Sequence, residues 1–200
     1  MTKIISSKMK YCRTTSSNIF GSKKFKNPTP PGQHGKRKRK PTEYCKQIRE
    51  AKKLRLFYGN LKLGYLKTLY EKVKTFKGNK IDKLIEFLER RLSTVVFRGK
   101  FASTISGAKQ LVSHGFIQVN GQKVNISSYL LKEGDVITLS QKMKENHLIL
   151  TAISSESRSI PPFLDGSKKF EIKFLNRTGF DNSLYPCQMQ LQKIIEFLSR

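Results

Sequence analysis

Acidic residues are scarce in this sequence. Its 200 residues include 40 Lys and Arg but only 14 Asp and Glu, which gives a net charge of +26. Self-repulsion of that size destabilises a compact free protein, so we expect a polyanionic partner. The imbalance is greatest at the front, because residues 1–80 carry a net charge of +20 and residues 81–200 only +6. We therefore predict that the N-terminal part contributes most of an electrostatic interface.

Long apolar runs are also lacking. No stretch is apolar enough to span a membrane, and no basic amphipathic helix presents a wide apolar face, so we expect no membrane partner. The start, MTKIISSKMKYCRTTSS, has no apolar core of the kind that directs secretion. Its basic, Ser/Thr-rich composition is typical of transit peptides and equally of an RNA-bound arm, and we expect no removable leader.

Metal-ligand and catalytic motifs are missing as well. The cysteines and histidines are scattered along the chain: Cys12, Cys45 and Cys187; His34, His114 and His147. A structural zinc ion needs four closely spaced ligands, so the cysteines are interpreted as thiols of a reducing compartment. The chain has no G-x-S-x-G motif, Walker loop, H-E-x-x-H motif or patterned pair of carboxylates. We expect no catalytic residue, no metal and no cofactor.

The most informative segment that is present is Phe101–Val124, FASTISGAKQLVSHGFIQVNGQKV. Ser103 is placed to cap a short helix, and Gly115 is placed to end it. The pair Asn120-Gly121 between two β-capable runs indicates a type I′ hairpin. Such a helix-plus-hairpin unit, almost free of acids, is a plausible platform for a nucleic acid backbone.

Apolar periodicity predicts several further helices. Thr42 is expected to cap the first, which Gly59-Asn60 ends. The predicted helices are 43–58, 63–77, one starting near 79 that extends as far as 96, and 191–198. The last of these needs an apolar partner, for which the helices of 43–92 are the candidates.

Residues outside the helices predict short strands and an irregular arm. Strands are expected at 129–131, 136–139 and 170–174, whereas 148–153 suits either a strand or a helical turn. Residues 1–41 contain few apolar side chains, so they are predicted to be irregular when free and ordered on a partner. The fold class is therefore α+β.

A dense cationic run follows a glycine-rich turn in the arm. Lys36–Lys40 are five consecutive cations beside Gly32–Gly35, and such a run binds nucleic acid by releasing counterions. A solvated surface run or a nuclear import signal would have a similar sequence. The net charge of +20 on residues 1–80 favours nucleic-acid binding over these two interpretations. The helix 43–58 adds five cations against two acids, which favours phosphate contact.

Three segments resemble one protein family. RLSTVVFRGKFASTISGAKQLVSHGFIQVNGQKVNISSYLLKEGDVITLS resembles the RNA-binding domain named after protein four of the small ribosomal subunit. Two further segments are similar to the rest of that ribosomal protein: PPGQHGKRKRKPTEYCKQIREAKKLRLFYGNL and the ending YPCQMQLQKIIEFLSR. The start, MTKIISSKMK, and the ending are most similar to the versions in alphaproteobacteria and in mitochondria. By these segments the chain is identified as a member of the small ribosomal subunit protein four (S-four) family.

The resemblance implies an architecture and a role. The implied domains are a basic arm of residues 1–41, a helical domain of 42–90 with 175–200, and an inserted RNA-binding domain of 91–174. The implied role is that of a structural constituent of the small ribosomal subunit, which binds small-subunit rRNA at a multi-helix junction and nucleates assembly of the body. Neighbouring small-subunit ribosomal proteins, and mRNA on its path into the subunit, are the other implied partners, with an influence on decoding accuracy.

The resemblance also implies which residues contact RNA. These are Gly32, Gln33, His34, Gly35, Lys36, Arg37, Lys38, Arg39, Lys40, Arg49, Lys52, Lys53, Arg55, Arg91, Arg98, Ser103, Thr104, Lys109, Gln110, His114, Asn120 and Lys123. The chain departs from the family pattern at Ile105, where the family usually has Arg, and at Gly107, where it usually has Glu. Some members hold zinc with four N-terminal cysteines, and with only Cys12 in that region no zinc is expected.

Two other functions use the same RNA-binding domain. An RNA-modifying enzyme would need a separate catalytic domain, for which no pattern is present, and a ribosome-rescue factor would not need the helical domain. The lysine-rich, drifted sequence predicts a location in the mitochondrial matrix, in the small subunit of the mitochondrial ribosome, with the bacterial cytoplasm as the alternative.

Overall fold

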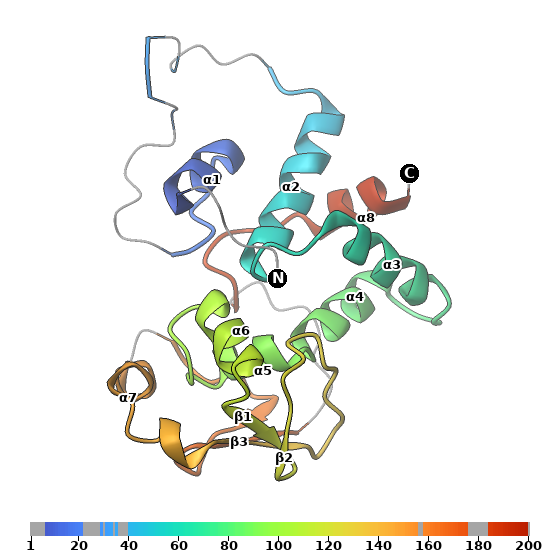
Figure 1. Ribbon diagram of the computed structural model, residues 1–200. Helices are drawn as coiled ribbons and strands as arrows, with labels where there is room; N and C mark the ends of the chain where they lie inside the picture. Colours follow the sequence, from blue (N-terminus) through green and yellow to red (C-terminus); the bar gives the residue numbers. More distant parts are fainter. Residues whose placement is uncertain are drawn as a thin grey trace. The chain divides into compact units, whose positions relative to one another are not determined.

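Two compact units make up the protein. The computed structural model describes residues 7–21, 29, 31–33, 35, 40–155, 158–175 and 184–199. The first unit comprises Met1–Ile81 with Phe180–Arg200, and the second comprises Asp82–Gly179 (Figure 1). The division into domains expected from the sequence, with boundaries at residues 41, 90 and 174, stays a prediction.

The described part of the first unit is helical. Its helices are α1 (Lys8–Thr15), α2 (Glu43–Phe57), α3 (Leu63–Lys74) and α8 (Leu191–Ser199). Helix α8 packs on α2, which confirms the predicted partner of the C-terminal helix. Leu54, Leu66 and Ile194 are fully buried in its core. Two helices far apart in the sequence therefore form the centre of this unit.

The ends of α2 follow the sequence prediction. Thr42 has an extended backbone, and its side chain accepts a hydrogen bond from the backbone N–H of Cys45 at 3.3 Å. After the helix, Gly59 and Asn60 both have positive φ, 76° and 57°. Left-handed residues turn the chain out of a helix, so the predicted cap and stop are both confirmed.

Helix α1 is a departure from the prediction of an irregular arm. The side chain of Ser7 accepts the N–H of Lys10 and caps the helix, which packs against α2. Cys12 and Ile19 are 1% and 0% exposed. A short helix needs only a few apolar side chains when another helix covers them, which explains why residues 8–15 are ordered despite the polar composition.

The second unit combines helices with a sheet. Its elements are α4 (Lys80–Glu89, beginning at the boundary), α5 (Leu92–Arg98), α6 (Ile105–Ser113), β1 (Ile117–Val119), β2 (Gln122–Lys123), β3 (Val136–Leu139), η1 (Gln141–Met143), α7 (His147–Ser154), β4 (Leu164–Asp165) and β5 (Glu171–Phe174). Among the described residues the sheet has five antiparallel strands in the order β2-β1-β3-β5-β4. The predicted α+β class is confirmed.

The hairpin between β1 and β2 is the predicted one. Asn120 and Gly121 both have positive φ, 50° and 78°, as a type I′ turn requires. The Asn120 amide also ties the hairpin to β3, because Nδ2 donates to Asp135 Oδ1 and Oδ1 accepts the N–H of Val136, both at 2.9 Å. Asn120 therefore shapes the turn and anchors it to the neighbouring strand.

Three predictions about this unit need correction. The helix expected from 79 as far as 96 is broken between α4 and α5, because Arg91 is extended and bridges to Leu130. That single bridge also replaces the strand expected at 129–131. Thr104, and not Ser103, caps α6: its hydroxyl oxygen accepts the N–H of Gly107 at 3.1 Å.

The structure decides between the two alternatives predicted for residues 148–153 and shortens the strand predicted at 170–174. Residues 148–153, suited to a strand or a helix, lie in helix α7, where the side chain of Asn146 caps the first turn. The strand expected at 170–174 is present as β5, with Ile172 and Phe174 buried, whereas Phe170 has a φ of 66° and lies just before it. Strand β5 is paired with β3 on one side and β4 on the other. Its buried side chains contribute to the core, where Ile172 lies close to Gly99 at the end of α5.

Close approach of α5 to β5 leads to a test of stability. A Cβ atom on Gly99 would lie 2.0 Å from Cδ1 and 2.7 Å from Cγ1 of Ile172, a side chain that is 1% exposed. We expect Gly99→Ala to lower the free energy of unfolding by about 1–3 kcal/mol, measured by urea denaturation. Gly64 lies in α3 with nothing within 4 Å of such an atom, so Gly64→Ala should be neutral or stabilising. Equal effects of the two substitutions would contradict this packing.

Candidate nucleic-acid interface

Polar side chains of α6 and the β1–β2 hairpin form the candidate interface of the second unit. Ser103, Gln110, His114, Asn120 and Lys123 are exposed, and Thr104 and Lys109 are half-buried. We call these seven residues the helix-hairpin surface. Helix α6 ends at Ser113 with His114 as its C-cap, and Gly115 follows with a φ of 71° in the predicted stop position.

The end of α6 and strand β2 meet at Gly115. A Cβ atom there would lie 2.0 Å from Cε and 2.8 Å from Nζ of Lys123, so the lysine side chain crosses directly over the glycine. The ring of His114 stacks on Phe116 with centroids 5.9 Å apart. Gly115 thus gives the backbone its turn and leaves room for Lys123, which brings an ammonium group close to the exposed end of the helix.

Lys109 has an unusual electrostatic position. Burial, and to a smaller extent the positive charge of nearby Arg91, lower its pKa to about 8. Arg91 itself is only 5% exposed. Two cations held close together in a poorly solvated place favour an anion beside them, and a phosphate group would supply the opposite charge.

Arg98 belongs to the core of the second unit. Its Nε and Nη2 atoms donate to the Glu89 carboxylate at 3.1 and 2.7 Å, and the two side chains are 8% and 0% exposed. The guanidinium is therefore neutralised inside the unit, where it holds α4 to α5. This position gives Arg98 a structural role, and the surface that we propose for RNA does not include it.

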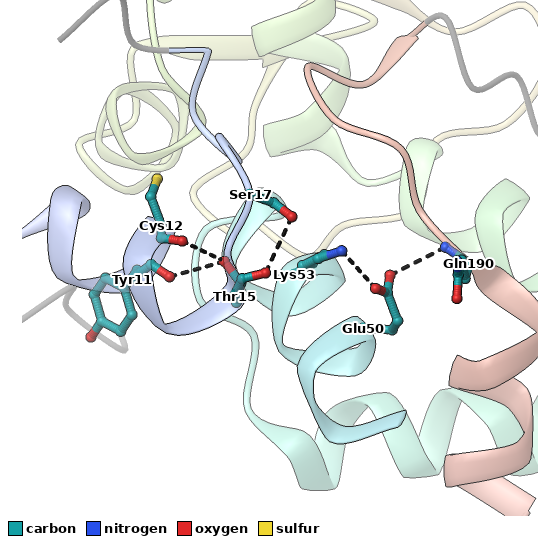
Figure 2. Close-up of polar contacts among 7 residues, drawn as sticks. All are labelled: Tyr11, Cys12, Thr15, Ser17, Glu50, Lys53 and Gln190. Carbon is teal, nitrogen blue, oxygen red and sulfur yellow. Dashed lines mark hydrogen bonds and ion pairs between the residues drawn. The ribbon is translucent and has the colours of Figure 1, made fainter. Parts of the chain in front are cut away.

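Half of the predicted α2 cations also have internal partners. Lys53 Nζ lies 2.6 Å from Glu50 Oε1, and Figure 2 shows this ion pair beside the hydrogen bond from the backbone N–H of Gln190 to the same carboxylate. Arg55 donates to the carbonyl oxygen of Leu61 at 2.7 Å, and burial lowers its pKa. Arg49 and Lys52 are the half-exposed cations that remain on this helix.

Helix α1 contributes cations that sequence reasoning did not assign to RNA. Lys8 and Lys10 are exposed and Arg13 is half-exposed. The Nζ atom of Lys52 in α2 lies 5.8 Å from the ring centroid of Tyr11 in α1, so a cation of α2 lies beside α1. Ser7 before a helical stretch was the sequence signal for an ordered α1 that could have revealed these positions.

The glycine-rich turn of the arm is described only in part. Gly32, Gln33 and Lys40 are exposed, and Gly35 donates its N–H to the Gly32 carbonyl at 3.1 Å. Gly32 has a φ of 102°, which only glycine adopts readily. His34 and Lys36–Arg39 lie outside the described residues, so their predicted contacts stay predictions.

The described part of the chain contains no group of three or more His, Cys, Asp or Glu side chains that could hold a metal ion. In the same residues no helix has both the length and the apolarity needed to cross a membrane. The three cysteines are free thiols.

Comparison with known proteins covers the whole chain. The model of the ribosomal protein S4/S9 N-terminal domain matches residues 3–89, and the model of the S4 domain matches residues 90–137. The small ribosomal subunit protein uS4 of Pelagibacter ubique is 39% identical over the full length of both chains. The chain belongs to the ribosomal protein S4 (S-four) family. The uS4 proteins of Acidiphilium cryptum and Rhodospirillum centenum are each 38% identical, also over both full lengths.

Membership in the S4 family confirms several sequence predictions. The sequence motifs predicted this family, and the two family models confirm it. The relatives come from alphaproteobacteria, as the predicted similarity to alphaproteobacterial versions requires. The family is one of structural, non-enzymatic proteins, so the prediction that this member is not an enzyme is also confirmed. The relatives are bacterial proteins, so they are consistent with the alternative prediction, the bacterial cytoplasm, and they do not show the mitochondrial location.

The buried pair of Arg98 and Glu89 is open to a direct test. We expect Arg98→Met to lower the free energy of unfolding by about 3–5 kcal/mol, because Glu89 keeps its charge in a buried place. The double variant Glu89→Leu/Arg98→Met should recover most of this loss, and urea denaturation measures both. Lys74→Met removes an exposed pair with Glu71 and should leave the unfolding curve unchanged. A double variant as unstable as the single one would show that the charge is not the cause.

Proposed function

We propose that this protein is a structural component of a small ribosomal subunit and binds small-subunit rRNA. The observation that carries the proposal is the match of the whole chain to proteins named as small ribosomal subunit protein uS4. The net charge of +26 fits a polyanionic partner, which the rRNA supplies.

Each unit offers RNA a different set of contacts. In the first unit these are the cations of α1, Arg49 and Lys52 of α2, and the run Lys36–Lys40, all suited to phosphate groups. In the second unit the helix-hairpin surface adds Lys109 and Lys123 together with polar side chains that can hydrogen-bond to sugar or phosphate oxygens. Phosphate contacts fix the orientation of a protein on RNA without reading its sequence, so this protein recognises the shape of its site.

Two RNA-binding units in one chain suit a junction of several RNA helices. Once one unit is bound, the other is held at a high effective concentration near neighbouring RNA, so the chain favours RNA arrangements that satisfy both units. This coupling supports the further proposals that the protein binds early at a multi-helix junction and nucleates assembly of the body. Contacts with neighbouring ribosomal proteins, and with mRNA on its path into the subunit, are the remaining proposals, with an effect on decoding accuracy.

The cell compartment is proposed from the relatives. They come from alphaproteobacteria, which favours the bacterial cytoplasm, and the mitochondrial matrix stays the prediction made from sequence drift. The size of the rRNA that co-purifies with the protein distinguishes a bacterial ribosome from a mitochondrial one.

The proposed function is tested by sedimentation. The tagged full-length protein should appear in purified small subunits in a one-to-one ratio with the rRNA, measured by quantitative mass spectrometry of gradient fractions. A protein that stays in the soluble fractions, or modifies bases in naked RNA, would overturn the proposal.

Salt dependence tests the cationic run. Replacing Lys36–Lys40 with glutamine should reduce the slope of log K against log salt by about 4 if all five side chains contact phosphate. A control variant with five exposed lysines replaced, in and around α3, changes the net charge equally: Lys62, Lys67, Lys72, Lys77 and Lys80. Filter binding to a junction fragment measures both slopes. If the two variants change the slope equally, the run acts only through net charge.

The pKa of Lys109 predicts a pH effect on RNA binding. A phosphate partner raises this pKa from about 8, so the contact is fully present below pH 8 and is lost as the pH rises through the higher pKa of the complex. We expect affinity to fall about tenfold more between pH 7 and 10 for the wild type than for Lys109→Arg, which stays charged. Parallel pH profiles for the two proteins would mean that Lys109 makes no phosphate contact.

A further inference from the structure

The turn between β1 and β2 carries the only Asn-Gly pair in the sequence, Asn120-Gly121. An asparagine followed by glycine is chemically labile, because no side chain keeps the next backbone nitrogen away from the carboxamide carbon. Both residues are exposed, and nothing lies within 4 Å of a Cβ atom built on Gly121. Water therefore has access to both of the residues that would react.

The fold ties the side chain of Asn120 to the neighbouring strand. Its Nδ2 atom donates to Asp135 Oδ1, and its Oδ1 atom accepts the N–H of Val136, both at 2.9 Å. The backbone N–H of Asn120 also donates to the carbonyl oxygen of Val136 at 2.8 Å. A carboxamide that turns toward the nitrogen of Gly121 has to give up both of its side-chain hydrogen bonds.

The acceptor of Nδ2 is itself fixed in place. Asp135 is 9% exposed, and its Oδ2 atom accepts the N–H of Lys132 at 2.8 Å. Its carbonyl oxygen accepts the N–H of Phe174 in β5 at 2.9 Å. A hydrogen bond to a fixed, poorly solvated carboxylate is stronger than one to water, so the Asn120 amide is held firmly.

We propose that Asn120 is a site of spontaneous deamidation and that its hydrogen bonds to Asp135 and Val136 set the rate of this reaction in the folded protein. The reaction proceeds from a locally opened turn, and the free energy of that opening slows it. The inference is independent of the proposed function, because it rests on the chemistry of the turn and not on RNA.

The reaction needs only water. The backbone nitrogen of Gly121 loses its proton to hydroxide and attacks Cγ of Asn120, which forms a C–N bond and closes a succinimide ring. The bond from Cγ to Nδ2 breaks, and Nδ2 leaves as ammonia with a proton from water. A second water molecule then opens the ring at one of its two carbonyl carbons, which gives aspartate or isoaspartate. No group is oxidised or reduced.

Both products weaken the junction between the hairpin and β3. Aspartate places a carboxylate opposite Asp135, where the amide of Asn120 was the donor, and like charges repel. Isoaspartate adds a methylene group to the backbone between Val119 and Gln122, the pair next to the turn. The change of one side chain therefore loosens the turn from the strand that anchors it.

Peptide mapping of the full-length protein measures the reaction. The protein is incubated at mildly alkaline pH, folded or in guanidinium, and mass spectrometry quantifies aspartate and isoaspartate at each asparagine. We expect Asn120 to react first in guanidinium and about tenfold or more slowly in the folded protein, since opening breaks hydrogen bonds. Asn60 is an internal control, because it has a similar φ of 57° but is followed by Leu61. It should react far more slowly than Asn120 in guanidinium.

A pair of variants isolates the hydrogen bond to Asp135. Asp135→Ala removes the acceptor of Nδ2, so deamidation of Asn120 should be about tenfold faster in the folded variant than in the folded wild type. Asp165→Ala is the matched control: it removes the same charge from β4 of the same sheet, where Asp165 Oδ1 accepts the N–H of Ser167 at 2.9 Å. This variant should leave the rate at Asn120 unchanged. Circular dichroism shows whether both variants are folded.

Three results would overturn the proposal. The first needs no variant: a rate at Asn120 that is as high in the folded wild type as in guanidinium. The second is a rate that Asp135→Ala leaves unchanged or lowers, since a lower rate would make the carboxylate a base in the reaction. The third is an equal acceleration by Asp135→Ala and Asp165→Ala, which would attribute the effect to charge alone.

Discussion

Scarcity of acidic side chains is the constraint on which the rest of this structure depends. The sequence has 14 Asp and Glu. Among those that the structure describes, four are buried, and each one holds parts of the fold together: Glu50, Glu86, Glu89 and Asp135. Glu50 binds Lys53 and the N–H of Gln190, and Glu89 binds Arg98. The three buried glutamates neutralise cations beside them, whereas Asp135 accepts the Asn120 amide and the backbone N–H of Lys132. Most of the exterior positive charge is thereby left for a polyanion. These four acids therefore serve the stability of the fold and the electrostatics of its surface.

This arrangement divides the cations into two classes. Arg98, Lys53 and Arg55 are held by internal partners, as a fold requires of charges with little access to solvent. Lys109 and Lys123 belong to the helix-hairpin surface, where Lys123 is exposed and Lys109 is half-buried, and we propose that both contact RNA. The amino-acid composition does not distinguish the cations with internal partners from those on the surface, whereas the packing of the folded chain does.

Local features were predictable from the sequence, and long-range ones were not. The cap at Thr42, the stop at Gly115 and the turn at Asn120-Gly121 depend on a few adjacent residues, and all three are confirmed. The break at Arg91 depends on a bridge to Leu130, and the order of α1 depends on α2, so neither could be read from neighbouring residues. For the candidate site, the RNA contacts expected from the motifs stay predictions, whereas Arg98, one of those residues, has an internal partner in Glu89, nine positions away.

The packing of α8 on α2 has a consequence for synthesis on the ribosome. The second unit is continuous in sequence, so all of its elements are synthesised before the last segment of the first unit. Domains usually fold in the order in which they are made, but here the N-terminal helices must wait for the last helix before their core can close. Until then the apolar face of α2 stays uncovered on the nascent chain, so the part of the molecule that is made first is completed last.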